Sequence, residues 1–497
     1  MNSSPYLLGV DNGGTVTKAA VYDASGNELA VAGVKCELVF PSPGHAEKDI
    51  GGLWAANVRV IGEALQKAGI DAGQIAGVAV TGHGNGMYLV DAHGRPAWNG
   101  INSADTRASD YVRKWYADGT AERLLPRICQ SIWPAQPVAL LAWFRDRQPE
   151  VLARTRWVFM CKDYIRYRLT GEAFAELTDY SGTSLLDVRR LDYDRDLLEA
   201  FGIAGCRDKL PPLRRPEEIC GRVTRAAAAE TGLREGTPVA GGLFDISACA
   251  IASGIVDPAQ LCLVAGSWSI NQYISAAPVE DKDLFMTSVY CLPGYWLILE
   301  GSAASASNLD WVVAELLDRA GGRSGYDVCG DLVAAVPAEG SDIVFLPFLY
   351  GSNVGPQASS CFLGLRGWHH RDHLLRAVFE GVTFSHKTHV DRLLAYRDAP
   401  RAARLAGGAA RSAVWVQMFA DVLGVPIELT ASEELGAMGA AICAGTAVGL
   451  FSSYPEAVAR MVRVARTVEP RPAFTELYAR KYARYQRYVK ALANAWE

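Results

Sequence analysis

Two aspartates, each placed just beyond an apolar strand and next to glycines, are the residues of this sequence best suited to chemistry. Asp11 ends the apolar run 7–10 and precedes two glycines and Thr15. Asp245 follows a short strand and Gly242, and it opens a helix of small residues. Glycines let backbone N–H groups approach an anion. A lone carboxylate can bind Mg²⁺ beside phosphate, or accept a proton from a hydroxyl.

Each aspartate also has a structural interpretation that needs no ligand. Asn12-Gly13 is a common type I′ hairpin turn, and an aspartate such as Asp245 is favoured in the first turn of any helix. These alternatives stay open on the residues alone.

The second half of the chain repeats the opening pattern. The apolar run 261–265 leads into Gly266, Ser267 and Trp268, and a return strand follows at 270–274. Two glycine–hydroxyl hairpins, one opening each half, predict duplicated halves that bind a polyphosphate from both sides. A third glycine turn, 407–412, joins a strand to the helix 413–423 and is a plausible floor for a nucleotide. The Gly/Ala-rich helix that opens near residue 434 suits either close packing or contact with a purine.

Further polar residues follow other strands of the first half. His83, Gly84 and Asn85 come after the buried strand 75–80, where they suit hydrogen bonding to a polyol or form a plain turn. Asp105 suits a ligand or a helix N-cap, and Arg107 a ligand or a surface charge.

The elements that must position these residues can be placed from the apolar pattern. The chain predicts a hairpin over 7–22, a strand at 29–34, a helix at 52–68 and a strand at 75–80. Later helices are predicted at 137–145, 162–169 and 371–396, and His386 and His389 on the last of these are interpreted as packing residues.

Length and composition limit the class of protein. A chain of 497 residues is too long for one core, so we expect two domains, 1–254 and 255–497. A net charge of −5, with no basic block, argues against nucleic acid or a membrane surface as partner. We see neither a signal peptide nor a membrane-spanning run, and the 11 scattered cysteines favour reduced thiols in a cytoplasmic protein.

Over nearly its whole length the chain resembles the FGGY carbohydrate kinases. Residues 11–15 look like the first phosphate loop of that family, and 266–268 like the second. The stretch 407–412 is similar to the adenosine-side signature, and 242–245 occupies the place of the catalytic aspartate. The resemblance implies an α/β fold with two ribonuclease-H-like (actin-like ATPase) domains and a cleft between them.

Within that family the sequence is most similar to the xylulose kinases, particularly the L-xylulose (lyxose-pathway) type, in stretches 242–245 and 380–386. Two departures from the D-xylulose pattern fall on sugar-facing positions. Ile246 stands where those enzymes have asparagine, and 83–86 replaces their Gln-Met-His-Gly loop.

The resemblance implies transfer of the γ-phosphoryl group of ATP to a ketopentose hydroxyl, most simply of L- or D-xylulose, with ATP and Mg²⁺ as cofactors. Asp245 would be the catalytic base and Asp11 the Mg²⁺ ligand. The implied nucleotide-binding residues are Asp11, Gly13, Gly14, Thr15, Lys18, Gly266, Ser267, Trp268, Asn308, Gly407, Gly408, Ala409 and Ser412. The implied sugar-binding residues are His83, Gly84, Asn85, Asp105, Arg107 and Asp245.

Other functions remain compatible with the sequence. A kinase for ribulose, erythritol or glycerol would need the same machinery, and an actin-like ATPase that drives a partner protein would share the phosphate loop. The expected partners are a small sugar substrate and, as one assembly the resemblance allows, a second copy in a homodimer.

Overall fold

The computed structural model describes residues 5–317, 325–352, 354–355 and 357–496. The chain forms two compact units, and each unit is built from three separate stretches of the chain. The first unit contains Met1–Val256, Ile274–Ile298 and Glu434–Arg463, and the second contains Asp257–Tyr273, Leu299–Glu433 and Val464–Glu497. The domain boundary at residue 254 that we expect from the sequence stays a prediction.

The first unit is built on a mixed sheet with the strand order β13-β14-β5-β1-β2-β3. Its strands are β1 (Tyr6–Asn12), β2 (Val16–Asp23), β3 (Glu28–Lys35), β5 (Ile75–Gly82), β13 (Ile219–Arg222) and β14 (Pro238–Ala240), with β15 (Leu243–Phe244) also paired to β5. Smaller strands are β4 (Glu47–Lys48), β6 (Tyr88–Asp91), β7 (Gly100–Ile101), β8 (Thr155–Phe159), β9 (Ala175–Glu176), β10 (Leu186–Asp187), β11 (Asp192–Tyr193), β12 (Leu213–Arg214) and β18 (Met286–Val289).

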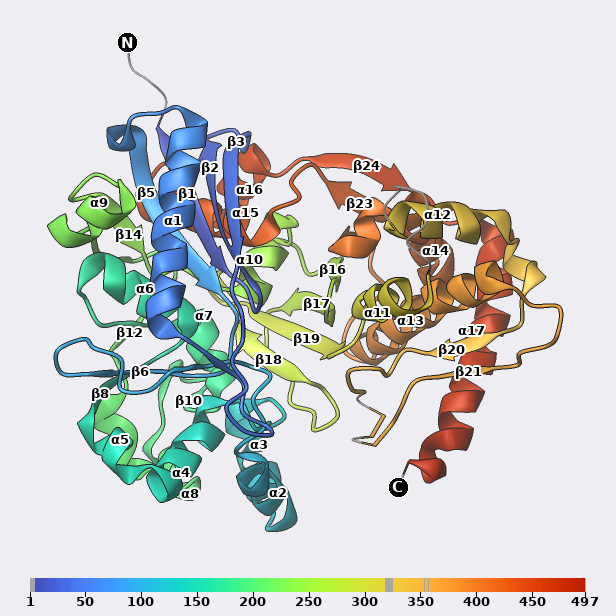
Figure 1. Cartoon of the computed structure of the whole chain (residues 1–497), viewed down its shortest axis with the longest axis horizontal. Coiled ribbons are helices and arrows are strands. Elements are labelled where there is room, and N and C mark those ends of the chain that lie inside the picture. The colour runs from blue at the N-terminus through green and yellow to red at the C-terminus, as the bar shows by residue number, and fades with distance from the viewer. Residues whose placement is uncertain (1–4, 318–324, 353, 356, 497) are drawn as a thin grey trace. The chain divides into compact units, whose positions relative to one another are not determined.

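The helices of the first unit are α1 (Ile50–Ala68), α2 (Ser109–Ala117), α3 (Thr120–Ile128), α4 (Pro137–Arg147), α5 (Pro149–Arg154), α6 (Cys161–Thr170), α7 (Leu177–Tyr180), α8 (Arg195–Ala200), α9 (Arg225–Thr231), α10 (Asp245–Ala252), α15 (Leu435–Ala447) and α16 (Tyr454–Met461). Figure 1 shows α1 lying along the blue strands β1 to β3. The predicted opening hairpin, the strand at 75–80 and the helices at 52–68, 137–145 and 162–169 are confirmed, with small shifts at their ends.

The second unit repeats this plan. Its main strands run in the order β19 (Trp296–Ser302), β17 (Ser269–Ser275), β16 (Gln260–Ala265), β22 (Ala402–Ala406), β23 (Ile427–Thr430) and β24 (Val464–Val468). The remaining elements are β20 (Val344–Leu346), β21 (Cys361–Leu363), α11 (Ser307–Leu316), α12 (Gly325–Ala335), α13 (Arg371–Leu393), α14 (Ala413–Leu423) and α17 (Pro472–Leu492).

The two sheets match strand for strand at their centres. β1 pairs antiparallel with β2 and parallel with β5, and β16 pairs antiparallel with β17 and parallel with β22. The predicted duplication is therefore confirmed at the level of topology. In each unit the glycine–hydroxyl turn lies at the tip of the central hairpin.

The two histidines of α13 are packing residues, as predicted. His386 is buried and hydrogen bonds with Asn271 and Ser305, and His389 is buried and bonds with Glu300.

Strand β1 is covered on both faces, and the alternation of its side chains decides what each face contacts. Leu8 and Val10 belong to the apolar core that includes residues of α1. On the opposite face Gly9 lies so close to α15 that a Cβ atom there would be 1.8 Å from the carbonyl oxygen of Ala437. The Gly/Ala-rich helix is thus a close-packing element, and we reject the alternative that it lies against a purine.

All 11 cysteines are free. Among the helices that the structure describes, none has the length and apolar character needed to cross a bilayer.

The close contact between Gly9 and Ala437 of α15 predicts that Gly9→Ala destabilises the protein. The added methyl group must push α15 away from β1, which we expect to lower the free energy of unfolding by about 1–3 kcal/mol. Thermal or urea unfolding measures this free energy. Gly205→Ala is the control, because a Cβ atom at this exposed glycine meets nothing within 4 Å. Equal stability of the two variants would contradict the close approach.

Candidate active site

Asp11 lies at the end of β1, against the first turn of α15. A Cβ atom at Gly436 would be 2.2 Å from Oδ2 of Asp11, so only glycine leaves room for the carboxylate there. A helix N-terminus stabilises negative charge. Asp11 is partly exposed, and no described residue donates a hydrogen bond to its carboxylate. Its oxygens are therefore available to a ligand.

Several charges surround Asp11. Lys18 pairs with Glu434 at 2.7 Å between Nζ and Oε2, and Lys48 donates a hydrogen bond of 2.9 Å to the carbonyl oxygen of Gly13. Burial raises the pKa of Asp11 to about 6; the positive charges of Lys18 and Lys48 lower this pKa, and Glu434 raises it.

The loop after Asp11 is not the type I′ turn considered from the sequence. Neither Asn12 nor Gly13, the central residues of that turn, has a positive φ, whereas a type I′ turn needs φ > 0 at both. A Cβ atom at Gly14 would meet nothing within 4 Å. Thr15 is exposed at the tip. The base of the loop is fixed by paired hydrogen bonds between the buried side chains of Asn12 and Asn57, so a firmly held loop faces open space, as anion binding by backbone N–H groups needs.

Asp245 is the first residue of α10 and follows β15, which pairs parallel with β5. Its Oδ1 accepts a hydrogen bond of 2.7 Å from the N–H of Ile246. Burial and the negative charge of Asp11 raise the pKa of Asp245 to about 7. The two aspartates thus belong to one neighbourhood, at the end of the sheet where β1, β5 and β15 finish.

A buried polar network holds the strand that carries Asp245. The N–H of Phe244 donates to Oγ1 of Thr178 at 3.0 Å, and that hydroxyl donates to Glu176 at 2.8 Å. Arg166 donates to the carbonyl oxygen of Gly241 at 2.6 Å. Thr178 belongs to a polar cluster, 178–183, whose role the sequence leaves open between a cleft lining and a helix cap. Sequence reasoning missed Glu176 and Arg166 as positioning residues, because they lie far from residue 245 in the chain.

The loop after β5 contacts β15, the short strand that precedes Asp245. His83 is buried and hydrogen bonds to the hydroxyl of Tyr88 at 3.0 Å between Nε2 and the oxygen. Burial and the charge of Lys48 lower the pKa of His83 to about 3, so the ring is neutral. A Cβ atom at Gly84 would be 2.0 Å from the ring of Phe244, next to Asp245. Oδ1 of Asn85 is buried and has no hydrogen-bond partner among the described residues.

Asp105 and Arg107 form a buried ion triad with Glu47. Arg107 Nη2 lies 2.8 Å from Asp105 Oδ2 and 2.7 Å from Glu47 Oε1. Both simpler interpretations from the sequence are wrong. Asp105 does not cap α2, whose N-cap is Ala108, and the side chain of Arg107 is 0% exposed. In the described part of the chain Nη1 of Arg107 finds no partner.

In the second unit the turn at 266–268 is held by the start of α11. The carbonyl oxygen of Gly266 accepts from the N–H of Ala306 at 2.9 Å, and that of Ser267 from the N–H of Ser305 at 3.1 Å. Asn308 is buried and donates to the carbonyl oxygens of Ser305 and Pro347, so it helps to fix the segment that contacts this turn.

A pocket of about 780 Å³ opens beside the third glycine turn, a size suited to a nucleoside. It is lined by Leu309, Asp310, Tyr326, Gly330, Asp331, Ala334, Phe379, Gly408, Arg411, Ser412, Ala413, Val414 and Trp415. Gly408 and Ser412 are predicted nucleotide-binding residues, whereas Ala409 is fully buried. Tyr326 and Asp310, joined by a hydrogen bond of 2.8 Å, are wall residues that sequence reasoning missed.

Gly407 shapes the same turn. Its φ is +85°, and a Cβ atom there would be 2.6 Å from the carbonyl oxygen of Ala265, so glycine is required on both counts. No group of three or more metal-ligating His, Cys, Asp or Glu side chains occurs within the described ranges.

Comparison with known proteins finds matches over most of the chain. The signature of the FGGY family of carbohydrate kinases, N-terminal domain, matches residues 6–252, and that of its C-terminal domain matches residues 261–448. The chain is 38% identical to the L-xylulose/3-keto-L-gulonate kinase of Escherichia coli (strain K12), over 98% of this chain and 97% of that protein. It is 35% identical to a probable L-xylulose kinase of Pasteurella multocida (strain Pm70), over 98% of this chain and 99% of that protein.

Among solved structures, a xylulose kinase from Rhodospirillum rubrum matches with a TM-score of 0.88 and 30% identity, over 99% of both chains. The predicted fold class, α/β with two ribonuclease-H-like (actin-like ATPase) domains, is confirmed.

The raised pKa of Asp245 predicts a stability effect. Its value of about 7 in the folded protein lies above the ordinary 3.8, so its favourable contribution is present at low pH and is lost as the pH rises through about 7. Asp245→Asn cannot ionise, and near pH 8 it should raise the free energy of unfolding by about 1–3 kcal/mol.

Unfolding midpoints near pH 5 and near pH 8 measure this effect, with the exposed Asp208→Asn as control. The gain should be clearly smaller near pH 5 than near pH 8, because the stability contribution of the carboxyl is fully present only below its ordinary pKa of 3.8. A gain of the same size at both pH values would contradict ionisation as its cause.

Proposed function

Since the chain belongs to the FGGY family of carbohydrate kinases, we propose that this sugar phosphotransferase moves the γ-phosphoryl group of ATP to a hydroxyl of xylulose, with L-xylulose as the first candidate. The names of the relatives in Escherichia coli and Pasteurella multocida support the L-enantiomer. D-xylulose and other ketopentoses are the nearest alternatives.

The observation that carries the mechanism is the shared environment of Asp245 and Asp11. A carboxylate whose pKa is raised to about 7 is well matched to accept the proton of a sugar hydroxyl near neutral pH. The strand that carries Asp245 is fixed by the network through Thr178, Glu176 and Arg166, so that Asp245 can aim the hydroxyl oxygen at the phosphorus atom.

Asp11 fits the role of Mg²⁺ ligand, directly or through water. Its carboxylate is an oxygen donor of the kind Mg²⁺ prefers, and it has no competing hydrogen-bond donor among the described residues. When bound, Mg²⁺ would neutralise charge on the β- and γ-phosphates. The backbone N–H groups around Gly13, Gly14 and Thr15 would bind phosphate oxygens, with Lys18 beside them.

In the second unit, Gly266, Ser267 and Trp268 are proposed to bind phosphate, and the pocket beside Gly408 and Ser412 to bind adenosine. Its volume and the aromatic ring of Tyr326 in its wall support this assignment.

On the sugar side, neutral His83, Gly84, Asn85, Asp105 and Arg107 are proposed to bind hydroxyl groups. The unpartnered Oδ1 of Asn85 and Nη1 of Arg107 can each make one further hydrogen bond.

We also propose a cytoplasmic location, which suits 11 free cysteines, and a homodimer, which sedimentation would test.

A substrate panel tests the reaction. ATP consumption, coupled to ADP detection, is measured with L-xylulose, D-xylulose, L-ribulose, 3-keto-L-gulonate, erythritol and glycerol. We expect the highest kcat/KM with L-xylulose, and a loss of about 10³-fold or more in Asp245→Asn. Hydrolysis of ATP that needs no sugar and survives in the variant would instead indicate an ATPase that acts on a partner.

The pH dependence follows from the need for an ionised base. Asp245 is protonated below its pKa of about 7 and cannot then accept a proton, so kcat/KM for the sugar should rise through this range and level off above it. Initial rates from about pH 5.5 to pH 9 give the midpoint. A profile that is flat over this range would contradict the assignment of Asp245 as base.

The nucleotide pocket can be tested separately. A Cβ atom at Gly408 has no neighbour closer than 4.0 Å, so Gly408→Val should fold normally while its side chain fills part of the pocket. We expect KM for ATP to rise about tenfold and KM for the sugar to change little. Gly367→Val, at an exposed and open glycine, is the control. Unchanged KM for ATP would place the nucleotide elsewhere.

A further inference from the structure

Lys48 is a buried cation that neither the sequence patterns nor the proposed mechanism uses. Its residue is 1% exposed. It lies in β4, which pairs antiparallel with β7, so that Lys48 faces Gly100 and Glu47 faces Ile101 across the ribbon. The next residue, Asp49, is the N-cap of α1 and accepts hydrogen bonds from the N–H groups of Gly51 and Gly52. The backbone of Lys48 is therefore fixed on both sides.

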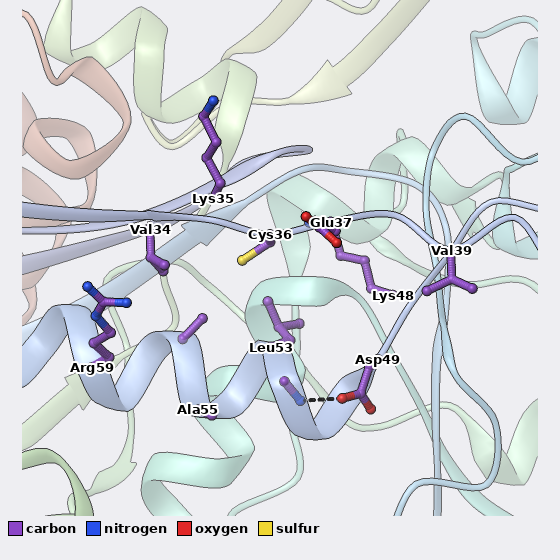
Figure 2. Close-up of a pocket in the computed structure, with 12 residues that line it drawn as sticks. Val34, Lys35, Cys36, Glu37, Val39, Lys48, Asp49, Leu53, Ala55 and Arg59 are labelled. Carbon is purple, nitrogen blue, oxygen red and sulfur yellow. Dashed lines mark hydrogen bonds between the residues drawn. The ribbon is translucent and has the colours of Figure 1, made fainter.

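Alternation along β4 sends its two charged side chains in different directions. Glu47 contacts Arg107 in the ion triad, whereas Nζ of Lys48 donates to the carbonyl oxygen of Gly13 at 2.9 Å. Figure 2 shows Lys48 in the wall of a pocket of about 460 Å³, together with Cys36 and with Leu53 of α1. Nζ of Lys48 thus contacts the proposed phosphate loop directly.

The positive charge of Lys48 is poorly compensated. An ammonium group has three donors, and burying it without a counter-ion is unfavourable. No carboxylate of the described residues forms an ion pair with Lys48, and its one hydrogen bond goes to a neutral carbonyl. The other cations nearby differ, because Lys18 pairs with Glu434 and the buried Lys162 lies within 3.6 Å of three carboxylates.

The field of Lys48 reaches both halves of the proposed reaction. Its charge is among the causes that lower the pKa of Asp11, on the phosphate side, and of His83, on the sugar side. Lys48 thus has titratable neighbours on both sides but no carboxylate of the described residues in ion-pair contact, and the phosphoryl group in transfer would supply an anion at that distance.

We propose that the ammonium of Lys48 is a further catalytic group, which contacts an oxygen of the phosphoryl group as it passes from ATP to the sugar. This inference rests on the proposed function. In the step, the bond between the γ-phosphorus and the β,γ-bridging oxygen breaks, the bond from phosphorus to the sugar oxygen forms, and the hydroxyl proton goes to Asp245. Lys48 keeps its proton and stabilises the charge on the transferred group.

The competing role for Lys48 is structural, in which its only task is to hold the carbonyl oxygen of Gly13. A structural support would affect ATP and ADP alike, because the loop binds phosphates of both. A cation placed for the γ-phosphoryl group would affect ATP and the chemical step, and would leave ADP almost unchanged.

The test compares Lys48→Met, which removes the charge at similar length, with Lys48→Arg, which keeps it. Lys35→Met is the matched control, because Lys35 is an exposed lysine in the wall of the same pocket. We measure dissociation constants of Mg²⁺-ATP and Mg²⁺-ADP by calorimetry without sugar, melting temperatures, and kcat and KM with L-xylulose.

For Lys48→Met we expect kcat to fall about 10²–10³-fold, ATP to bind about tenfold more weakly, and the affinity for ADP and KM for the sugar to change about twofold or less. Lys48→Arg should recover part of kcat, and Lys35→Met should resemble the wild type.

Equal weakening of ATP and ADP together with a lower melting temperature would overturn the proposal and favour the structural role, and so would a kcat within about threefold of wild type. The calorimetric dissociation constants of Mg²⁺-ATP and Mg²⁺-ADP need no turnover. If the wild type phosphorylates none of the sugars, the proposed function fails, while the ATP-to-ADP comparison still decides whether Lys48 contacts the γ-phosphate.

Discussion

The arrangement of the first unit depends on keeping two carboxylates, Asp11 and Asp245, in one poorly hydrated neighbourhood. Burial raises the pKa of both, and the charge of Asp11 adds to the rise at Asp245. Like charges in such a place oppose folding above the pKa of the groups. The surroundings offset this with Lys18, with Lys48 and with the N-terminal end of α15, so stability is exchanged for a base that works near neutral pH.

Glycines make this neighbourhood possible. Gly9 and Gly439 let α15 approach β1 and α10 at backbone distance, and Gly436 leaves space for the carboxylate of Asp11. A side chain at Gly9 or Gly436 would separate α15 from β1, and one at Gly439 would separate it from α10. The helix that packs the core is therefore also the helix that defines the position of the proposed metal ligand.

The second unit uses the same topology for a different task. Its central hairpin carries Gly266 and Ser267 where the first unit carries Gly13 and Gly14, but it has no counterpart of Asp11. The third glycine turn, at Gly407, borders a pocket large enough for a nucleoside. Duplication supplied two glycine turns, and the lone acid in one of them distinguishes the proposed metal side from the nucleotide side.

The sequence by itself determined the local features of this protein: the hairpins, the glycine turns, the helix that ends at Gly424 and the family to which the chain belongs. The hairpins, turns and helix follow from short-range rules of strand alternation, turn chemistry and capping, whereas the family follows from the resemblance of the glycine motifs to known ones. Only the tertiary structure decided the roles of the side chains that meet from distant parts of the chain. Arg107 is a buried triad member because Glu47 lies beside it, Thr178 holds the strand of Asp245 from 66 residues away, and Lys48 reaches Gly13. A single sequence carries no local signal for such contacts, because packing sets them.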